Sequence, residues 1–353
     1  MAGGAGQAGQ HLARQADACE RLGSPLYGRV LRACAADLAE GGPVADLLTG
    51  HLDSPYDDAV GLRMLGGVHH LVLTGRAERL ARQYPSAGGH ADGDLVPAFL
   101  ATLGEHRGSV APWLDRPPQT NEVGRSTGLV GGLLRVLGGR DLPVLLHEVG
   151  ASAGLNLNGD RYRHQVGAGG PWWGPATSPV RLEDAWQGAA PDPAAPLRVL
   201  ERHGSDVAPV DLAEPGAADR LLAYVWPDQT ARLDRLRAAL QVVAEHPVTV
   251  DRLTAADAVG RLSLRDGHLT VLWHSVMWQY VPAEEQRAVE EALAALGATA
   301  TEAAPLVRLS LEPATADQGR PGDFDVSATV WPGGTPRVLG HASPHGAPVR
   351  WLP

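Results

Sequence analysis

The stretch that decides the fold is LPVLLHEVGASAGLN (142–156). It begins as an apolar run that predicts a buried strand, and Glu148 stands near the end of that run. The turn that follows, GASAG (150–154), consists only of small residues. Small residues let a backbone turn tightly, approach a ligand closely and start a helix at once. The stretch therefore predicts a strand whose end is built for a close backbone approach.

Strand-like and helix-like segments alternate after this stretch. The strand-like segments are LRVLERHGSDVAP (197–209), VTVDRLTAADAV (248–259, a strand leading into a turn), HLTVLWHSVMWQYV (268–281) and PLVRLSLEP (305–313), and the helical ones are 230–246 and 282–296. Alternation of this kind predicts a mostly parallel sheet with crossover helices. FDVSATVWPGG (324–334) and the segment 336–352 predict a closing antiparallel strand pair.

The upstream part of the chain has a different pattern. Apolar residues recur there at three- and four-residue spacing, which predicts a helical cap domain over 11–115. Residues 1–10 are rich in Gly and Ala and are expected to be disordered. We therefore predict an α/β domain over 116–353, with an insertion at about 160–196 that is rich in Gly, Pro and Trp and is expected to form a long loop.

Composition excludes several classes of protein. The 353 residues are 44% hydrophobic and carry a net charge of −10, which argues against a general nucleic-acid or anionic-membrane binder. Two cysteines exclude a disulfide framework and a Cys-rich zinc site. No secretory signal or membrane span is visible, so we expect a cytoplasmic protein.

The turn allows three interpretations. Gly150-Ala151-Ser152-Ala153-Gly154 matches the G-x-S-x-G turn that carries the nucleophile of serine hydrolases. In those enzymes several strands precede the turn, whereas the upstream hundred residues here look helical. A tight strand-to-helix turn without any ligand would need the same small residues. The third interpretation is a cofactor loop in which Ser152 replaces a middle glycine.

In this third interpretation the stretch resembles motif I of class I S-adenosylmethionine-dependent methyltransferases, E-x-G-x-G-x-G. In that family the loop backbone wraps the methionine part of the cofactor, and the acid acts through the amino group or nearby loop amides. The resemblance implies a methyltransferase-like, Rossmann-like sheet and S-adenosylmethionine as cofactor. The implied cofactor contacts are Glu148, Gly150, Ser152, Gly154 and Asn156.

Later segments follow in the order of that family. HGSDVAP (203–209) is similar to the end of its second strand, whose acid binds ribose, and this implies that role for Asp206, with Glu201 as a competitor. TAADAV (254–259) is similar to the segment that contacts adenine, which implies a contact from Asp257.

The segment 269–281 is similar to the family's fourth strand with its substrate-facing loop, and the closing pair to its sixth and seventh strands. Asp206 lies farther along the chain than the family pattern places the ribose acid, so the insertion with Trp172, Trp173 and Trp186 must account for the difference.

Nearly the whole chain also resembles a family of uncharacterised actinobacterial proteins that is known only as a domain of unknown function. The resemblance implies one shared architecture and supplies no activity. The segments that carry it are GSPLYGRV, RPPQTNEVGRS, HEVGASAGLNLNGDRY, YVWPDQTARLDRLRAAL, HSVMWQYV, WPGG and the terminal segment containing His345-Gly346.

A polar cluster precedes the first strand. We expect Gln119, Asn121, Glu122 and Arg125 to form a substrate clamp over the glycine loop. Asn121 can cap a helix and place Glu122 and Arg125 one turn apart on one face. The alternative is a capped helix with an exposed ion pair.

Four further residues are candidates for the substrate pocket between the cap and the carboxyl ends of the strands. Trp226 can bind substrate, Asp228 and Tyr280 can take part in catalysis, and His274 can act as a general base because its pKa lies near neutrality. The alternatives are that Asp228 caps the next helix and that His274 is a satisfied core residue. No histidine spacing is typical of a metal site, so we predict no metal.

The predicted function is methyl transfer from S-adenosylmethionine to a polar small molecule. The same fold could instead serve a lyase or cyclase. A G-x-S-x-G hydrolase and an interaction protein without catalytic activity are further alternatives. We expect no nucleic-acid or membrane partner, and the sequence leaves open a partner protein or a homodimer.

Overall fold

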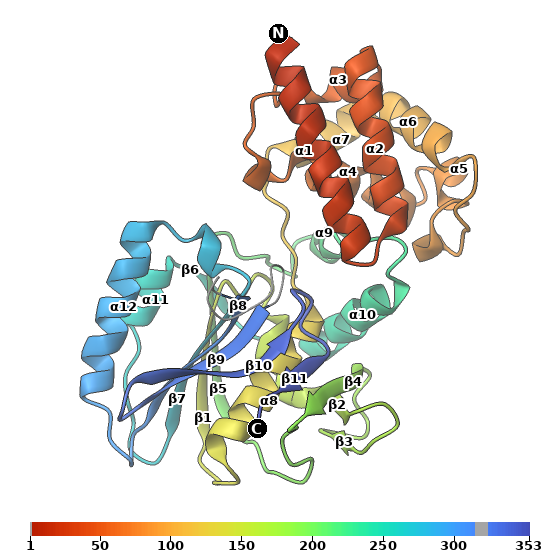
Figure 1. The fold of residues 1–353 in the computed structure, drawn as a ribbon. Coiled ribbons are helices and arrows are strands. Elements are labelled where there is room, and N and C mark those ends of the chain that lie inside the picture. The colour runs from red at the N-terminus through yellow and green to blue at the C-terminus, as the bar shows by residue number, and fades with distance from the viewer. Residues whose placement is uncertain (1, 315–323) are drawn as a thin grey trace. The chain divides into compact units, whose positions relative to one another are not determined.

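The computed structural model describes residues 2–314 and 324–353, and the chain forms two compact units (Figure 1). The helical unit contains the residues up to Thr120 together with Glu214–Asp234. The α/β unit contains Asn121–Ala213 and Arg235–Pro353. The segment 214–234, which the sequence placed with the α/β domain, is therefore part of the helical unit. None of the helices in the described residues is long and apolar enough to cross a bilayer.

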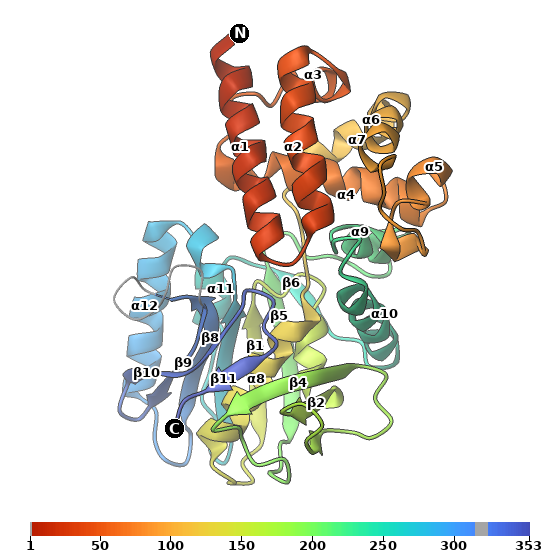
Figure 2. The same cartoon turned by 45° about the vertical axis from the view of Figure 1, so that its right-hand side comes forward.

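The helical unit starts with two long helices, α1 (Ala2–Arg21) and α2 (Pro25–Glu40), which lie side by side (Figures 1 and 2). Ser24 caps α2 because its side chain accepts a hydrogen bond from the backbone N–H of Tyr27. The predicted disorder of residues 1–10 is not what the structure has, since α1 runs back to Ala2. The other helices are α3 (Pro43–Leu48), η1 (Tyr56–Asp58), α4 (Val60–Leu73), α5 (Glu78–Ala81), η2 (Pro85–Ala87), α6 (Leu95–Glu105), α7 (Arg107–Leu114) and α9 (Ala217–Ala223).

Helix α9 completes the core of this unit by packing on α4. Gly66 of α4 leaves room for the ring of Tyr224, because a Cβ at Gly66 would lie 2.7 Å from the ring. His69, which is fully buried, donates from Nδ1 to the carbonyl of Ala223 at 3.0 Å. Buried polar groups of this kind need such partners, so the segment 214–234 is built into the core of the helical unit.

The α/β unit is organised around one eleven-stranded, mostly parallel sheet in the described residues. The strands are β1 (Val144–Val149), β2 (Arg163–Val166), β3 (Trp172–Trp173), β4 (Arg181–Gly188), β5 (Val199–Asp206), β6 (Val250–Arg252), β7 (Leu269–Ser275), β8 (Leu306–Pro313), β9 (Phe324–Trp331), β10 (Thr335–Ala342) and β11 (Val349–Trp351). They lie in the order β3-β2-β4-β11-β10-β9-β8-β7-β1-β5-β6.

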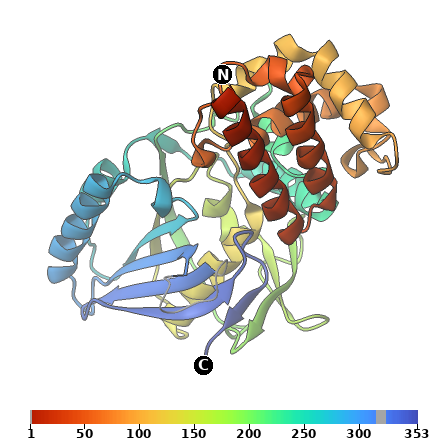
Figure 3. The ribbon, with the colours of Figure 1, turned by 45° about the horizontal axis from the view of Figure 1, so that its top comes forward.

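Five neighbouring strands, β6-β5-β1-β7-β8, are mutually parallel. The chain runs outward from β1 to β5 and β6, then returns to β7 on the other side of β1, so the strand order reverses between β1 and β7. In open parallel sheets this reversal opens a crevice at the carboxyl ends of the strands. The closing strands β9 and β10 form the predicted antiparallel hairpin, drawn in dark blue in Figure 3.

Helices cover the sheet where the sequence provides apolar faces. Helix α8 (Ser126–Leu137) is buried along almost its whole length, and its glycines let the sheet approach closely: a Cβ at Gly132 would lie 2.7 Å from Leu309 of β8. Helices α11 (Ala255–Gly260) and α12 (Ala283–Ala298) share a second apolar cluster with β1, β7 and β8. The remaining helices are η3 (Val123–Arg125), η4 (Leu155–Arg161), α10 (Thr230–Glu245), which leads from one unit to the other, and η5 (Trp278–Tyr280).

The connection from β1 to β5 differs from the sequence prediction. The segment 160–196 contains β2, β3 and β4 instead of one long loop. The residues after the glycine loop form the short 3₁₀ helix η4 instead of a crossover α-helix, and its geometry is kinked at Asn158. The expected α/β class, helical N-terminal region and C-terminal antiparallel pair are confirmed.

Candidate functional site

The glycine loop follows β1 at the point where the strand order reverses. Gly150, Ser152 and Gly154 all have positive φ, at 71°, 54° and 73°. This conformation is routine for glycine but uncommon for serine. Asp206 at the end of β5 holds the strained turn, because its Oδ2 accepts a hydrogen bond from the backbone N–H of Ser152 at 2.9 Å. Its Oδ1 accepts another from Ala208 N–H at 2.8 Å.

The two glycines of the loop serve different purposes. A Cβ at Gly154 would lie 2.6 Å from the side chain of Val248, so this glycine permits close packing beneath the loop. A Cβ at Gly150 would lie 2.9 Å from Met277 in the loop after β7. Met277 therefore packs directly over Gly150, and the loops that follow β1 and β7 are in contact at the reversal point.

Glu148 is a buried carboxyl group beside the glycine loop. Its side chain is buried, the residue is 2% exposed, and its Oε2 has no hydrogen-bond partner. Burial raises the pKa of Glu148 to about 8, although the nearby Arg125 guanidinium acts in the opposite direction. Asn156, also 2% exposed, lies close by with its own Oδ1 unpartnered. The side chains of Trp273 and Asn156 lie close enough to the Glu148 carboxyl group to lower its pKa by hydrogen bonding, yet the Oε2 atom of Glu148 and the Oδ1 atom of Asn156 have no hydrogen-bond partner.

The cluster that precedes β1 in sequence reaches this loop. Asn121 Oδ1 accepts a hydrogen bond from the backbone N–H of Leu155 at 2.9 Å, and Arg125 donates to the carbonyls of Pro344 at 3.0 Å and Ser275 at 3.4 Å. The expected helix cap needs correction: Glu122, not Asn121, caps η3 by accepting from Gly124 N–H at 3.0 Å. Glu122 is only 6% exposed, so the alternative of an exposed ion pair is excluded.

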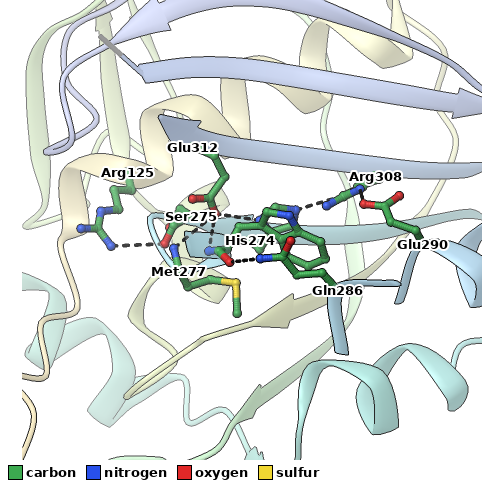
Figure 4. Close-up of polar contacts among 9 residues, drawn as sticks. Arg125, His274, Ser275, Met277, Gln286, Glu290, Arg308 and Glu312 are labelled. Carbon is green, nitrogen blue, oxygen red and sulfur yellow. Dashed lines mark hydrogen bonds and ion pairs between the residues drawn. The ribbon is translucent and has the colours of Figure 1, made fainter. Parts of the chain in front are cut away.

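His274 at the end of β7 is held from both sides (Figure 4). Its Nδ1–H donates to Oε1 of Glu312 on β8 at 2.8 Å, and its Nε2 accepts from Nε–H of Arg308 at 3.1 Å. Burial lowers its pKa, so the neutral ring is favoured. With both nitrogens engaged, this arrangement provides no ring nitrogen to take a proton from a substrate.

The loop after β7 is rigidly held although its backbone is strained. Val276 has a φ of 53°, which is exceptional for a β-branched residue. Oε1 of Glu312 also accepts from the backbone N–H groups of Met277 and Trp278, at 3.2 Å and 3.3 Å, and Gln286 on α12 donates to the carbonyl of Trp278 at 2.9 Å (Figure 4). Strain that the surroundings enforce in this way is typical of functional sites.

The sequence of this chain matches one family of bacterial proteins. Residues 9–351 match a bacterial protein family described as "Uncharacterized protein conserved in bacteria (DUF2332)". The chain belongs to this family. No curated protein and no solved structure matches this chain.

Other residues predicted for the site of this DUF2332 protein lie apart from the glycine loop or are already engaged. Asp257 is exposed on α11 and accepts from the hydroxyl of Thr254 at 2.9 Å. Glu201 pairs in register with Leu145 near the start of β1. Asp206 instead follows Ser205, which pairs with Val149 at the end of β1, where the glycine loop begins. Tyr280 lies in η5, downstream of Met277, and is 66% exposed.

Three predicted residues, Gln119, Trp226 and Asp228, belong to the helical unit. Asp228 accepts from the hydroxyl of Ser24 at 2.6 Å and from the backbone N–H of Leu26 at 3.0 Å, so both of its oxygens stabilise the start of α2. One interpretation of the sequence was that Asp228 caps the helix that follows it in the chain. In the structure Asp228 caps α2, which lies about 200 residues earlier. A pocket between the two units stays a prediction.

Sequence analysis missed Glu312 and Arg308, which position His274 and the loop after β7. They lie on β8 in VRLSLEP, where polar residues alternate with apolar ones, and that alternation was the available signal. Among the residues that the structure describes, no group of three or more His, Cys, Asp or Glu side chains could hold a metal ion.

Proposed function

We propose that this protein transfers a methyl group from S-adenosylmethionine to a polar small molecule. The observation that carries the proposal is the pair of buried, unpartnered acceptors, Glu148 Oε2 and Asn156 Oδ1, beside a glycine loop at the reversal point of a parallel sheet. A ligand bearing an ammonium group would supply the missing donors. The strand order of the five parallel strands is the 3-2-1-4-5 order of dinucleotide-binding sheets, which supports a nucleoside-containing ligand.

The residues around the loop fit the amino-acid part of such a cofactor. Glu148 and Asn156 would hold its ammonium group, and Arg125, close enough to Glu148 to act on its pKa, carries the charge that suits its carboxylate. Asp206 retains acceptor capacity for a ribose hydroxyl beyond the two backbone N–H groups that it binds. When bound, the cofactor supplies an electrophilic methyl group.

We assign to this chain the positioning of the cofactor and the substrate, and the exclusion of water from the site where they meet. Both nitrogens of the His274 ring are engaged by Glu312 and Arg308, so we assign this ring no role as a base. Methyl transfer to a nucleophilic substrate can proceed by alignment alone. Tyr280, exposed on the loop after β7, is the remaining candidate to contact the substrate.

The hydrolase alternative has less support. Ser152 Oγ is buried and makes no hydrogen bond in the described residues, so no base is in place to activate it. A fluorophosphonate probe should leave Ser152 unlabelled, and labelling there would favour the hydrolase instead.

The test is calorimetric titration with S-adenosylmethionine and S-adenosylhomocysteine, alongside methylthioadenosine, which lacks the amino-acid part. We expect both full-length ligands to bind at least about tenfold more tightly than methylthioadenosine, because each charge-assisted hydrogen bond contributes at least about 1.5 kcal/mol. At 100 times its Kd a ligand should stabilise the fold by about 2.7 kcal/mol, visible in a melting curve.

Matched variants sharpen this result. Binding an ammonium group to Glu148 requires the ionised carboxylate, so binding at pH 7 should release a proton and the measured heat should depend on the buffer. Glu148→Gln should remove that dependence and weaken binding, whereas Glu201→Gln, which removes a partly exposed carboxylate on β5 that pairs with Arg265, should change neither. If neither cofactor form produces heat or a melting shift, the methyltransferase proposal fails, and the lyase or cyclase alternative replaces it.

A further inference from the structure

The insertion between β1 and β5 has a face that the proposed function does not use. Its strands β2, β3 and β4 alternate: His164, Trp173 and Leu182 are buried, and the residues next to them, Arg163, Trp172 and Arg181, are more exposed. Because successive side chains of a strand point to opposite faces, the second set shares the outer face. We call Arg163, Trp172 and Arg181 the Arg-Trp face.

The two arginines of this face are neighbours in the sheet, and both contact one tryptophan ring. Arg163 and Arg181 are register partners on the neighbouring parallel strands β2 and β4. Their guanidinium carbons lie 4.9 Å and 4.7 Å from the centre of the Trp172 ring. Like charges at paired positions of a sheet repel each other, and the indole offsets this only in part through cation–π attraction.

Neither guanidinium is neutralised by a carboxylate. Among the described residues neither arginine takes part in an ion pair, whereas Arg202 on β5 pairs with Asp160 at 2.6 Å. The Nε of Arg163 is buried and has no hydrogen-bond partner. Glu183, two residues after Arg181 on β4, is exposed and pairs with neither arginine. The face therefore holds two positive charges without a carboxylate partner in a chain whose net charge is −10.

We propose that the Arg-Trp face binds the phosphate group of a small anionic ligand. An oxyanion between the two guanidinium groups would relieve their repulsion and accept from their N–H groups. Phosphate suits this better than carboxylate, because one arginine fork already occupies both carboxylate oxygens, whereas phosphate has oxygens for two forks. Trp172 holds both arginines in place before the ligand arrives, which lowers the entropy lost on binding. This site would give the Trp-rich insertion a role that is independent of the glycine loop.

The test is calorimetric titration of the full chain with inorganic phosphate and with phenyl phosphate, at ionic strength held constant with chloride. We expect saturable binding of one phosphate per chain. Arg163→Gln and Arg181→Gln should each weaken it by at least about tenfold, which corresponds to the loss of one charge-assisted contact. Arg350→Gln is the matched control, because Arg350 is also an exposed arginine of this sheet and donates to the neutral Gln187. It should leave the affinity unchanged.

Two further variants and the choice of probe distinguish a specific phosphate site from a general effect of ionic strength. Glu183→Gln removes the negative charge on the same strand and should tighten binding, and Trp172→Leu should weaken it. Tighter binding of phenyl phosphate than of inorganic phosphate would assign the site to an organic phosphate, and equal binding would assign it to the free ion. The proposal is overturned if Arg181→Gln binds phosphate like the wild type, or if every heat and melting shift follows ionic strength alone. If Arg163→Gln does not fold, the test relies on Arg181→Gln, because Arg181 is exposed and its substitution leaves the core of the unit unchanged.

Discussion

Glu148 retains a proton at neutral pH because its carboxyl group is buried, and this single residue makes the stability of the fold depend on pH. Burial raises its pKa from 4.5 to about 8 in the folded state, against the effect of Arg125. In the unfolded chain the group ionises above its ordinary pKa. The folded state therefore binds the proton more tightly, so the contribution to stability is full below pH 4.5 and is lost as pH rises towards 8.

This predicts the behaviour of Glu148→Gln, whose side chain stays neutral at every pH. The free energy of unfolding of the variant, relative to wild type, should increase with pH between 5 and 8, by up to about 1.4 kcal/mol per pH unit. Urea unfolding at a series of pH values measures the difference. Glu201→Gln should run parallel to wild type, because the hydrogen bond from Arg265 at 2.8 Å lowers the pKa of Glu201 and keeps it ionised over this range. A constant difference between Glu148→Gln and wild type from pH 5 to 8 would show that Glu148 titrates normally.

At the scale of elements, Glu312 connects β8 to the end of β7 and to the strained loop beyond it. One oxygen accepts from His274 and from the N–H groups of Met277 and Trp278. Glu312→Ala should leave these donors without an acceptor and destabilise the fold by about 3 kcal/mol, at about 1 kcal/mol or more per donor. Glu290→Ala, which removes an exposed partner of Arg308, should cost less than about 1 kcal/mol. Urea unfolding compares the two, and hydrogen exchange at Met277 and Trp278 should accelerate only in Glu312→Ala. Equal losses from both variants would contradict the role of Glu312.

The sequence could predict the strands that are buried, because continuous apolar runs such as LPVLLHEV and HLTVLWHS need a core on both faces. It could not predict β2, β3 and β4, which lie among Gly and Pro residues and gain their order from pairing with one another and with β11. The Glu312–His274 contact joins residues 38 positions apart and leaves no local pattern. Within the site, the glycine loop and the Asn121–Arg125 cluster follow from the local sequence, whereas the partners that fix them come from distant strands.

At the scale of the whole molecule, the chain passes from one compact unit to the other three times, after Thr120, Ala213 and Asp234. The excursion 214–234 is bound into the helical unit along its length. Its α9 packs on α4, Asp228 caps α2, and Gln229 donates to the carbonyl of Leu22 at 2.7 Å. The helical unit is therefore complete only when two stretches far apart in sequence come together, which the predicted boundary near 115 does not reveal.

A fragment of residues 1–120 should accordingly not fold to a stable state by itself. Without 214–234 it exposes the surface of α4 around Gly66 that Tyr224 covers, and it leaves buried His69 without the carbonyl of Ala223. The same fragment joined to 214–234 by a flexible Gly/Ser linker should unfold cooperatively, because it restores both contacts, and the control with Asp228→Ala in the joined segment should melt lower through loss of the α2 cap. Circular dichroism melting curves of the three fragments decide the matter. A cooperative transition of 1–120 alone, at the temperature of the joined fragment, would mean that 214–234 only rests on a finished domain and adds nothing to its core.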